Sequence, residues 1–183
     1  MFGAPGSGKG TQGKILGQVP GYYHCACGDV FRGLDLKNDL GKTFLEFSSK
    51  GELVPDEFTV RLWQSAIDGM VHTRRFDPSS DTLVLDGIPR NVHQARIMSE
   101  RIEVKKLFHL TCPDRIKLVE RLKRRALRDN RLDDANEETI RHRLEIYEAE
   151  SRPVLEYYDK KIIVMVDATQ PPIKVMNAIL QAL

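Results

Sequence analysis

The sequence contains little cysteine and lacks long hydrophobic runs. Only three cysteines occur among 183 residues, and their odd number and spacing argue against a disulfide framework or a four-cysteine zinc site. The longest apolar runs, LVLDGI and KIIVMV, are far too short to span a bilayer, and no secretory leader pattern opens the chain. We therefore expect reduced thiols in a cytoplasmic protein that has no membrane partner.

A strong excess of one charge is also absent. The formal net charge is +2 although 30% of the residues are charged, so a charged partner must be recognised by local clusters rather than by a global field. We find no internal repeat, low-complexity segment or interdomain linker. Because 41% of the 183 residues are hydrophobic, the chain can bury one sizeable core, which predicts a single domain over residues 1–183.

Short apolar runs alternate with longer stretches of helical periodicity. Runs rich in β-branched and aromatic residues cover 21–25, 82–86, 106–110 and 162–166. Their nearly continuous apolar character is typical of parallel strands buried on both faces. The alternation predicts an α/β doubly wound parallel sheet with helices on both faces. Three side chains are expected to cap the helices that follow them, Asp29, Asp114 and Asn136.

A glycine-rich loop lies near the beginning of the chain. GAPGSGK, residues 3–9, fits the phosphate-loop pattern GxxxxGK, in which glycines let consecutive backbone N–H groups surround an anion and the lysine reaches the outer phosphates. The spacing of Lys9 favours this reading over a flexible glycine-rich tail. Because a glycine follows the lysine and the hydroxyl comes one position later, direct magnesium ligation by that hydroxyl is less expected. The predicted ATP-binding residues of this segment are Gly3, Gly6, Ser7, Gly8, Lys9, Gly10 and Thr11.

Asp86 ends an apolar run and is therefore expected at the carboxyl edge of a strand, beside the loop. Aspartates at this place in phosphate-loop enzymes hold magnesium, here most simply through water. The alternative is an aspartate that starts the turn Asp86-Gly87. Next to a phosphate loop the metal role is favoured, so Mg²⁺ is the predicted cofactor.

Arginines recur at positions where further phosphates can be held. Transfer of a phosphoryl group between two anionic phosphates requires cations around the donor, the transferred group and the acceptor rather than a protein nucleophile. Planar guanidinium groups bind phosphate oxygens bidentately. Three of the arginines have i, i+4, i+7 spacing and form one stripe of a helix. The candidates are Arg32, Arg90, Arg121, Arg125, Arg128, Arg131 and Arg143.

Two alternatives exist for the basic stretch 121–131. One is a solvated basic face, and the other is a nucleic-acid patch. The stretch lacks interleaved aromatic residues for base stacking, and acidic residues that would repel a phosphate backbone follow it at 133–134 and 137–138. We therefore expect no nucleic-acid partner.

Five motifs in order identify a family. GAPGSGKGTQ, GDVFR, KGELVPDE, DGIPRNVHQA and NRLDDANEETIRHRLEIYE closely resemble those of adenylate kinases and the wider nucleoside monophosphate kinases. The resemblance implies a five-stranded parallel core, an acceptor-binding helical region at about 28–57 and a mobile lid at about 122–134. It also implies ATP, AMP and ADP as partners, and a monomer. The lid resembles the short form, so no structural zinc is expected.

The resemblance implies a role for each matching residue. Lys9 and the loop amides would hold the donor phosphates, and Arg121 would stack on the donor adenine with Arg125 nearby. The implied catalytic residues are Lys9, Arg90, Arg125, Arg131 and Arg143. The implied AMP-binding residues are Cys27, Arg32, Val54, Gly87, Arg90, Gln94, Arg131 and Arg143. Asp133 and Asp134 match the acidic pair that helps to hold the lid closed.

The acceptor base depends on fewer residues. Gln94 lies four residues after Arg90, where AMP kinases carry a glutamine that reads the adenine edge and UMP/CMP kinases carry an asparagine. Gln94 therefore favours AMP. Cys27, Ile88 and Asn91 differ from the AMP pattern, so UMP or CMP is the alternative acceptor. A nucleotide-binding module without efficient catalysis is a further alternative, but binding alone does not require the full arginine set.

The segment before the loop differs from the family. Relatives carry a full apolar strand there, whereas only Met1 and Phe2 precede the loop in this sequence. Either residues upstream are missing or another segment fills the position. Because that strand is central in the family's sheet, we expect exposed apolar faces and unpaired edges. This predicts that the chain as written is poorly stable, and that a version with an added upstream strand melts at a higher temperature.

Overall fold

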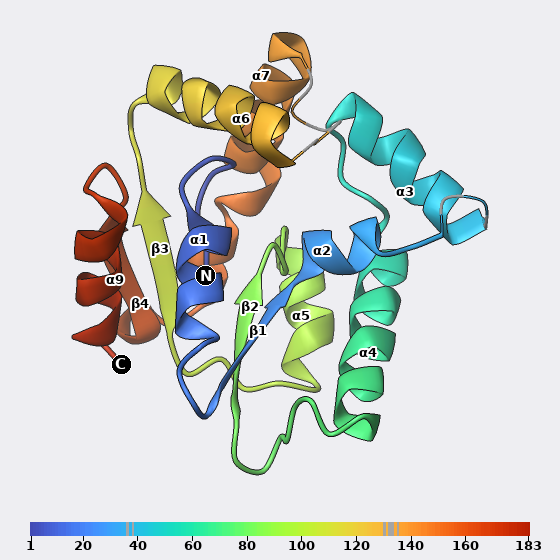
Figure 1. Ribbon diagram of the computed structural model, residues 1–183, viewed down its shortest axis with the longest axis vertical. Coiled ribbons are helices and arrows are strands. Elements are labelled where there is room, and N and C mark those ends of the chain that lie inside the picture. The colour runs from blue at the N-terminus through green and yellow to red at the C-terminus, as the bar shows by residue number, and fades with distance from the viewer. Residues whose placement is uncertain (36, 38, 130, 132–133, 135) are drawn as a thin grey trace.

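In a computed structural model of the chain, helices and parallel strands alternate (Figure 1). The structure describes residues 1–35, 37, 39–129, 131, 134 and 136–183. The strands are β1 (Tyr22–Ala26), β2 (Thr82–Asp86), β3 (Leu107–Thr111) and β4 (Ile163–Asp167). Each begins within one residue of its predicted start.

Helices occupy most of the remaining sequence. The α-helices are α1 (Lys9–Leu16), α2 (Cys27–Arg32), α3 (Asp39–Lys50), α4 (Asp56–His72), α5 (Val92–Ser99), α6 (Arg115–Asp129), α7 (Glu137–Ile146), α8 (Val154–Tyr157) and α9 (Pro172–Leu180). A π-helical turn, η2 (Tyr147–Ser151), continues α7, and a 3₁₀ turn, η3 (Lys160–Ile162), precedes β4.

The strands form two parallel pairs, β1 with β2 and β3 with β4. Residues 1 and 2 lie between the pairs. The Phe2 N–H donates to Phe108 O at 2.8 Å, and its carbonyl accepts from Leu110 N at 2.8 Å. The Met1 nitrogen donates to Leu85 O at 2.7 Å. Within the described residues, four strands in two pairs therefore replace the five-stranded sheet that the resemblance implies. The expected low stability stays a prediction.

Helices cover both faces of this sheet, as predicted. On one face, α1 packs against β1 and β2 and α9 packs against β4, with Leu16, Val166 and Ile179 in a buried cluster. On the other face, α2, α4 and α5 contribute to a second cluster that includes Trp63 and Met98. Figure 1 shows α6 and α7 at one end of the sheet, above the beginning of α1. The carboxyl ends of β1 and β2 point toward the same end.

Two of the three predicted helix caps are confirmed. Asp114 accepts from Lys117 N at 3.0 Å, and Asn136 accepts from Thr139 N at 2.7 Å. The prediction for Asp29 is wrong. Because β1 runs directly into α2, this helix begins three residues earlier with Ala26 at its N-cap, and the Asp29 carboxylate lies in the first turn.

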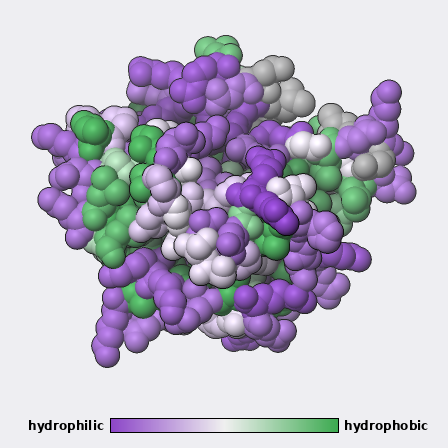
Figure 2. Space-filling model, turned by 60° about the horizontal axis from the view of Figure 1, so that its bottom comes forward, coloured by the Kyte–Doolittle hydropathy of each residue, from purple (hydrophilic) through white to green (hydrophobic). Residues whose placement is uncertain are grey.

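The surface is mainly hydrophilic. Figure 2, which brings the lower end of the molecule forward, shows apolar residues in separate groups among polar ones. Exposed apolar side chains include Met165 and Ile173. In the part of the chain that the structure describes, no helix has the length and apolar character needed to cross a bilayer.

Candidate active site

A cavity of about 760 Å³ opens at the end of the sheet where α1 begins. Its walls come from the glycine-rich loop, α2, the β2–α5 connection, α6 and α7. The residues expected to be catalytic, to bind ATP or AMP or to hold magnesium all line this cavity except Cys27. Cys27 is 1% exposed and packs in the core, where burial raises the pKa of its thiol to about 12. The folded chain thus brings together residues separated by more than a hundred positions.

The loop before α1 adopts a conformation that glycine permits. Gly3, Gly6 and Gly8 have φ values of 140°, 81° and 101°, which side-chain-bearing residues rarely adopt. A Cβ on Gly6 would lie 2.9 Å from Leu118 O, in α6. The glycines therefore allow both the turn and its close approach to α6, with the beginning of α1 at the cavity. A helix N-terminus in this position favours an anion.

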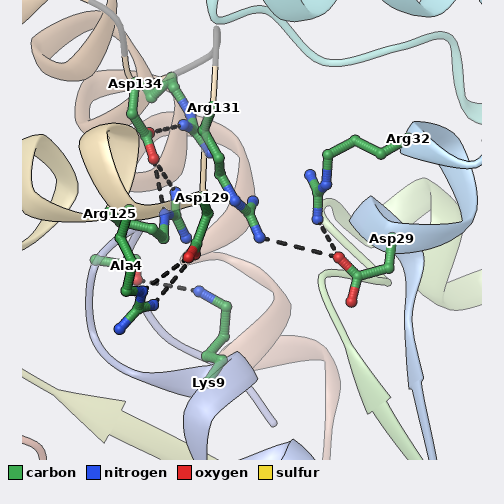
Figure 3. A network of polar contacts seen from close by, with 10 residues as sticks. Ala4, Lys9, Asp29, Arg32, Arg125, Asp129, Arg131 and Asp134 are labelled. Atoms are coloured by element: carbon green, nitrogen blue, oxygen red, sulfur yellow. Dashed lines mark hydrogen bonds and ion pairs between the residues drawn. The ribbon is translucent and has the colours of Figure 1, made fainter.

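Lys9 is partly buried at the start of α1. Its Nζ donates to Gly3 O at 2.7 Å and to Ala4 O at 3.0 Å, and Figure 3 shows this side chain turned back toward its own loop. Burial lowers the pKa of Lys9 to about 8, while the charge of Asp86 acts in the opposite direction. The charge of Asp86 therefore only partly offsets the loss of hydration of the Lys9 ammonium group. A bound polyanion would offset more of that loss.

Asp86 is the last residue of β2 and lines the cavity beside α1. A Cβ built on Gly10 would lie 3.2 Å from Asp86 Oδ2. The glycine that replaces the usual hydroxyl-bearing residue thus leaves space for this carboxylate at the helix start. A carboxylate oxygen next to a phosphate loop is a donor that fits Mg²⁺.

Asp29 lies between two of the predicted phosphate-binding arginines. Its carboxylate forms a hydrogen-bonded ion pair with Arg32, and Arg131 Nη2 lies 3.9 Å from Asp29 Oδ1. Figure 3 shows both guanidinium groups directed at the same oxygen of this carboxylate. Burial acts to raise the pKa of Asp29, but the hydrogen bond and the charge of Arg32 outweigh it, so the pKa is lowered. The sequence analysis missed Asp29 as a counter-ion, although its i, i+3 spacing from Arg32 was a signal.

Asp134 holds two further arginines. Its side chain is fully buried; Oδ2 accepts from Arg125 Nε at 2.7 Å, and Oδ1 pairs with Arg143. This ion pair connects α6 to α7. The other residue of the predicted acidic pair, Asp133, lies outside the described residues. Arg121, which also lies in α6, donates from Nη2 to Ala168 O at 2.9 Å.

A polar network surrounds Gln94 in α5. Gln94 Oε1 accepts from Arg90 N, and Nε2 donates to Asp56 Oδ1, each at 2.8 Å. Asn91 caps α5 by accepting from Gln94 N at 2.8 Å and donates to Asp56. Asn91, which differs from the AMP-kinase pattern, is therefore held in structural hydrogen bonds. The sequence analysis missed Asp56, whose position indicates only a helix start.

Comparison with known proteins agrees with this geometry. The family model described as adenylate kinase matches residues 1–163. An adenylate kinase from Thermobifida fusca is 35% identical over 100% of this chain and 96% of its own length. One from Flavobacterium psychrophilum is 37% identical over 86% of this chain and 82% of its own length. The chain therefore belongs to the adenylate kinase family of ATP-dependent nucleoside monophosphate kinases.

Proposed function

We propose that the protein transfers the terminal phosphoryl group of Mg-ATP to AMP and produces two molecules of ADP. The observation that carries this proposal is the cavity at the start of α1, where a phosphate loop and an aspartate meet arginines from several separate elements. A site that only bound one nucleotide would need the loop and one further cation. Membership of the adenylate kinase family supports the same reaction.

The cations have distinct roles in this mechanism. Lys9 and the loop N–H groups bind the donor phosphates, and Arg121 lies against the donor base. Arg32 and Arg90 bind the acceptor phosphate. The arginines around Asp134 and Asp29 surround the transferred group, where they stabilise the charge of the transition state without a protein nucleophile. These arginines are Arg125, Arg131 and Arg143.

Asp86 would hold magnesium through water at the end of β2. Magnesium held there would neutralise part of the phosphate charge. The contribution of the chain is the position of this carboxylate, which lies at the start of α1 beside Gly10. We propose no other metal.

AMP is the acceptor that Gln94 favours, because its amide carries a donor and an acceptor for a base edge. The relatives described above are adenylate kinases, and nothing among the comparisons favours UMP or CMP. We further propose that residues 28–57 bind the acceptor and that residues 122–134 act as a lid. The protein would act as a cytoplasmic monomer without a membrane or nucleic-acid partner.

Steady-state transfer from Mg-ATP to AMP, UMP, CMP and GMP, measured side by side, tests the proposal. We expect strong turnover with AMP alone. A preference for UMP or CMP would overturn the acceptor assignment. Binding of ATP without transfer to any acceptor would overturn the enzymatic function and favour a nucleotide-binding module.

A further inference from the structure

We propose that Asp56 is a positioning residue that fixes the orientation of the Gln94 amide, so that the site accepts a 6-amino purine and rejects a 6-oxo purine. This inference rests on the proposed function, in which Gln94 reads the acceptor base. Asp56 begins α4, whereas Gln94 lies in α5. The contact between them therefore joins two helices at the acceptor end of the cavity.

The orientation of the Gln94 amide follows from its two partners. The backbone N–H of Arg90 can only donate, so the atom 2.8 Å from it is Oε1. The Asp56 carboxylate can only accept, so the atom 2.8 Å from its Oδ1 is Nε2. Both partners specify the same orientation, and Gln94 is only 1% exposed. A flipped amide would direct its oxygen at a carboxylate and its NH₂ group at an N–H.

Asp56 is itself held in place. Asn91 Nδ2 donates to Asp56 Oδ1 at 2.8 Å and to Oδ2 at 3.0 Å. The orientation of Asn91 is also defined, because its Oδ1 accepts from the backbone N–H of Gln94 at 2.8 Å. The three side chains form a closed network in which a backbone donor fixes each amide. Asp56 provides the acceptors that complete it.

The remaining hydrogen-bonding capacity of Gln94 defines what it can read. A primary amide has two N–H donors and an oxygen with two lone pairs. After the contacts to Asp56 and Arg90, one donor and one acceptor remain, and Gln94 lines the cavity. The 6-amino group and adjacent ring nitrogen of adenine match this pair. A 6-oxo purine presents the reverse order and would match only the flipped amide, which Asp56 disfavours.

A purely structural role for Asp56 makes a different prediction. As an acidic residue in the first turn of α4, it also stabilises the helix dipole. Glu57 lies in the same turn and is exposed. Glu57→Gln therefore removes a similar charge from the helix start without changing a partner of Gln94, and it is the matched control for Asp56→Asn.

The experiment compares kcat/KM for AMP and for inosine monophosphate in the full chain. In Asp56→Asn, the new amide must direct an N–H toward Asn91 or Gln94, which removes one of the two restraints on the orientation of Gln94 and leaves only the Arg90 N–H. We expect the AMP preference to fall about tenfold, mainly through a higher KM for AMP, equivalent to about 1.4 kcal/mol. Asp56→Glu, which keeps the carboxylate, should recover part of the preference. Glu57→Gln should leave the preference unchanged.

Outcomes that contradict the inference can be separated from failure of the proposed function. Equal losses for both nucleotides in Asp56→Asn would overturn the positioning role and leave a structural one. If Gln94→Ala alters the preference but Asp56→Asn does not, only the role of Asp56 fails. If Gln94→Ala leaves the preference unchanged, the base is read elsewhere. The base-reading role of Gln94 and the positioning role of Asp56 then both fail, whereas transfer to AMP is tested separately by turnover. Thermal melts check that each variant folds. If Asp56→Asn does not fold, Asp56→Ser replaces it, and calorimetric Kd values for AMP and inosine monophosphate replace the kinetic comparison.

Discussion

The phosphate loop and the arginine cluster line one cavity but hold their charges by different means. Lys9 donates to carbonyl oxygens five and six residues away in its own loop. Arg125 and Arg143 instead share a carboxylate from another segment, nine residues from each in sequence. Asp29 in α2 likewise approaches Arg131, which follows α6. The loop is organised by adjacent backbone, whereas the arginines depend on side chains that the fold brings together.

This difference shows which substitutions should disturb the phosphate loop and which should disturb the arginine cluster. The loop geometry requires glycine at defined positions and changes little when distant side chains are altered. The arginine cluster depends on counter-ions such as Asp134 and on turns such as Gly87 to Arg90. Substitutions in the two halves should therefore differ in whether they affect chemistry, stability or pH dependence.

The largest effect is expected at Arg90. Its Nε donates to Gly87 O at 2.8 Å, which aims the rest of the guanidinium group at the cavity. Arg90→Lys loses the bidentate fork, and we expect kcat to fall about 100-fold or more at saturating substrates. Arg96→Lys, an exposed change in α5, the helix that follows Arg90, should leave kcat within about twofold. An unchanged kcat in Arg90→Lys would remove this residue from the proposed role.

A smaller effect, mainly on stability, is expected at Asp134. Asp134→Asn leaves Arg125 and Arg143 without their shared carboxylate. Because the two arginines remain 26% and 17% exposed, water compensates part of the loss, and we expect a destabilisation of about 2 kcal/mol in urea unfolding. Asp129→Asn, which affects an exposed pair with Arg128, should not change the unfolding midpoint measurably. Equal midpoints for the two variants would contradict the buried counter-ion role.

The smallest effect near neutral pH is expected at Lys9. Its pKa is lowered to about 8 by burial, and a bound phosphate would raise it, so ATP binding above pH 8 requires proton uptake. The Kd for ATP should be nearly constant below about pH 7 and rise about tenfold by pH 9. Lys9→Arg should abolish this rise, because arginine stays protonated in this range. A wild-type Kd that is flat to pH 9 would show that Lys9 stays charged without ligand.

Local sequence predicted the elements of the fold well. The four strands were found from apolar runs, and the phosphate loop from the spacing of its glycines and lysine, because both signals lie within a few consecutive residues. Asp29 was assigned to the wrong role because nothing local shows that β1 passes directly into α2. Cys27 was expected among the AMP-binding residues, but its side chain packs in the core.

The sequence by itself determined the order of strands and helices, the phosphate loop and, through ordered motifs, the membership of the adenylate kinase family. Only the tertiary structure decided how the charges are paired. Asp56 meets Gln94 38 residues away, and Asp29 meets Arg131 from another element. Such pairs depend on the distance between side chains after folding, which spacing along the chain does not encode once the partners lie on different elements.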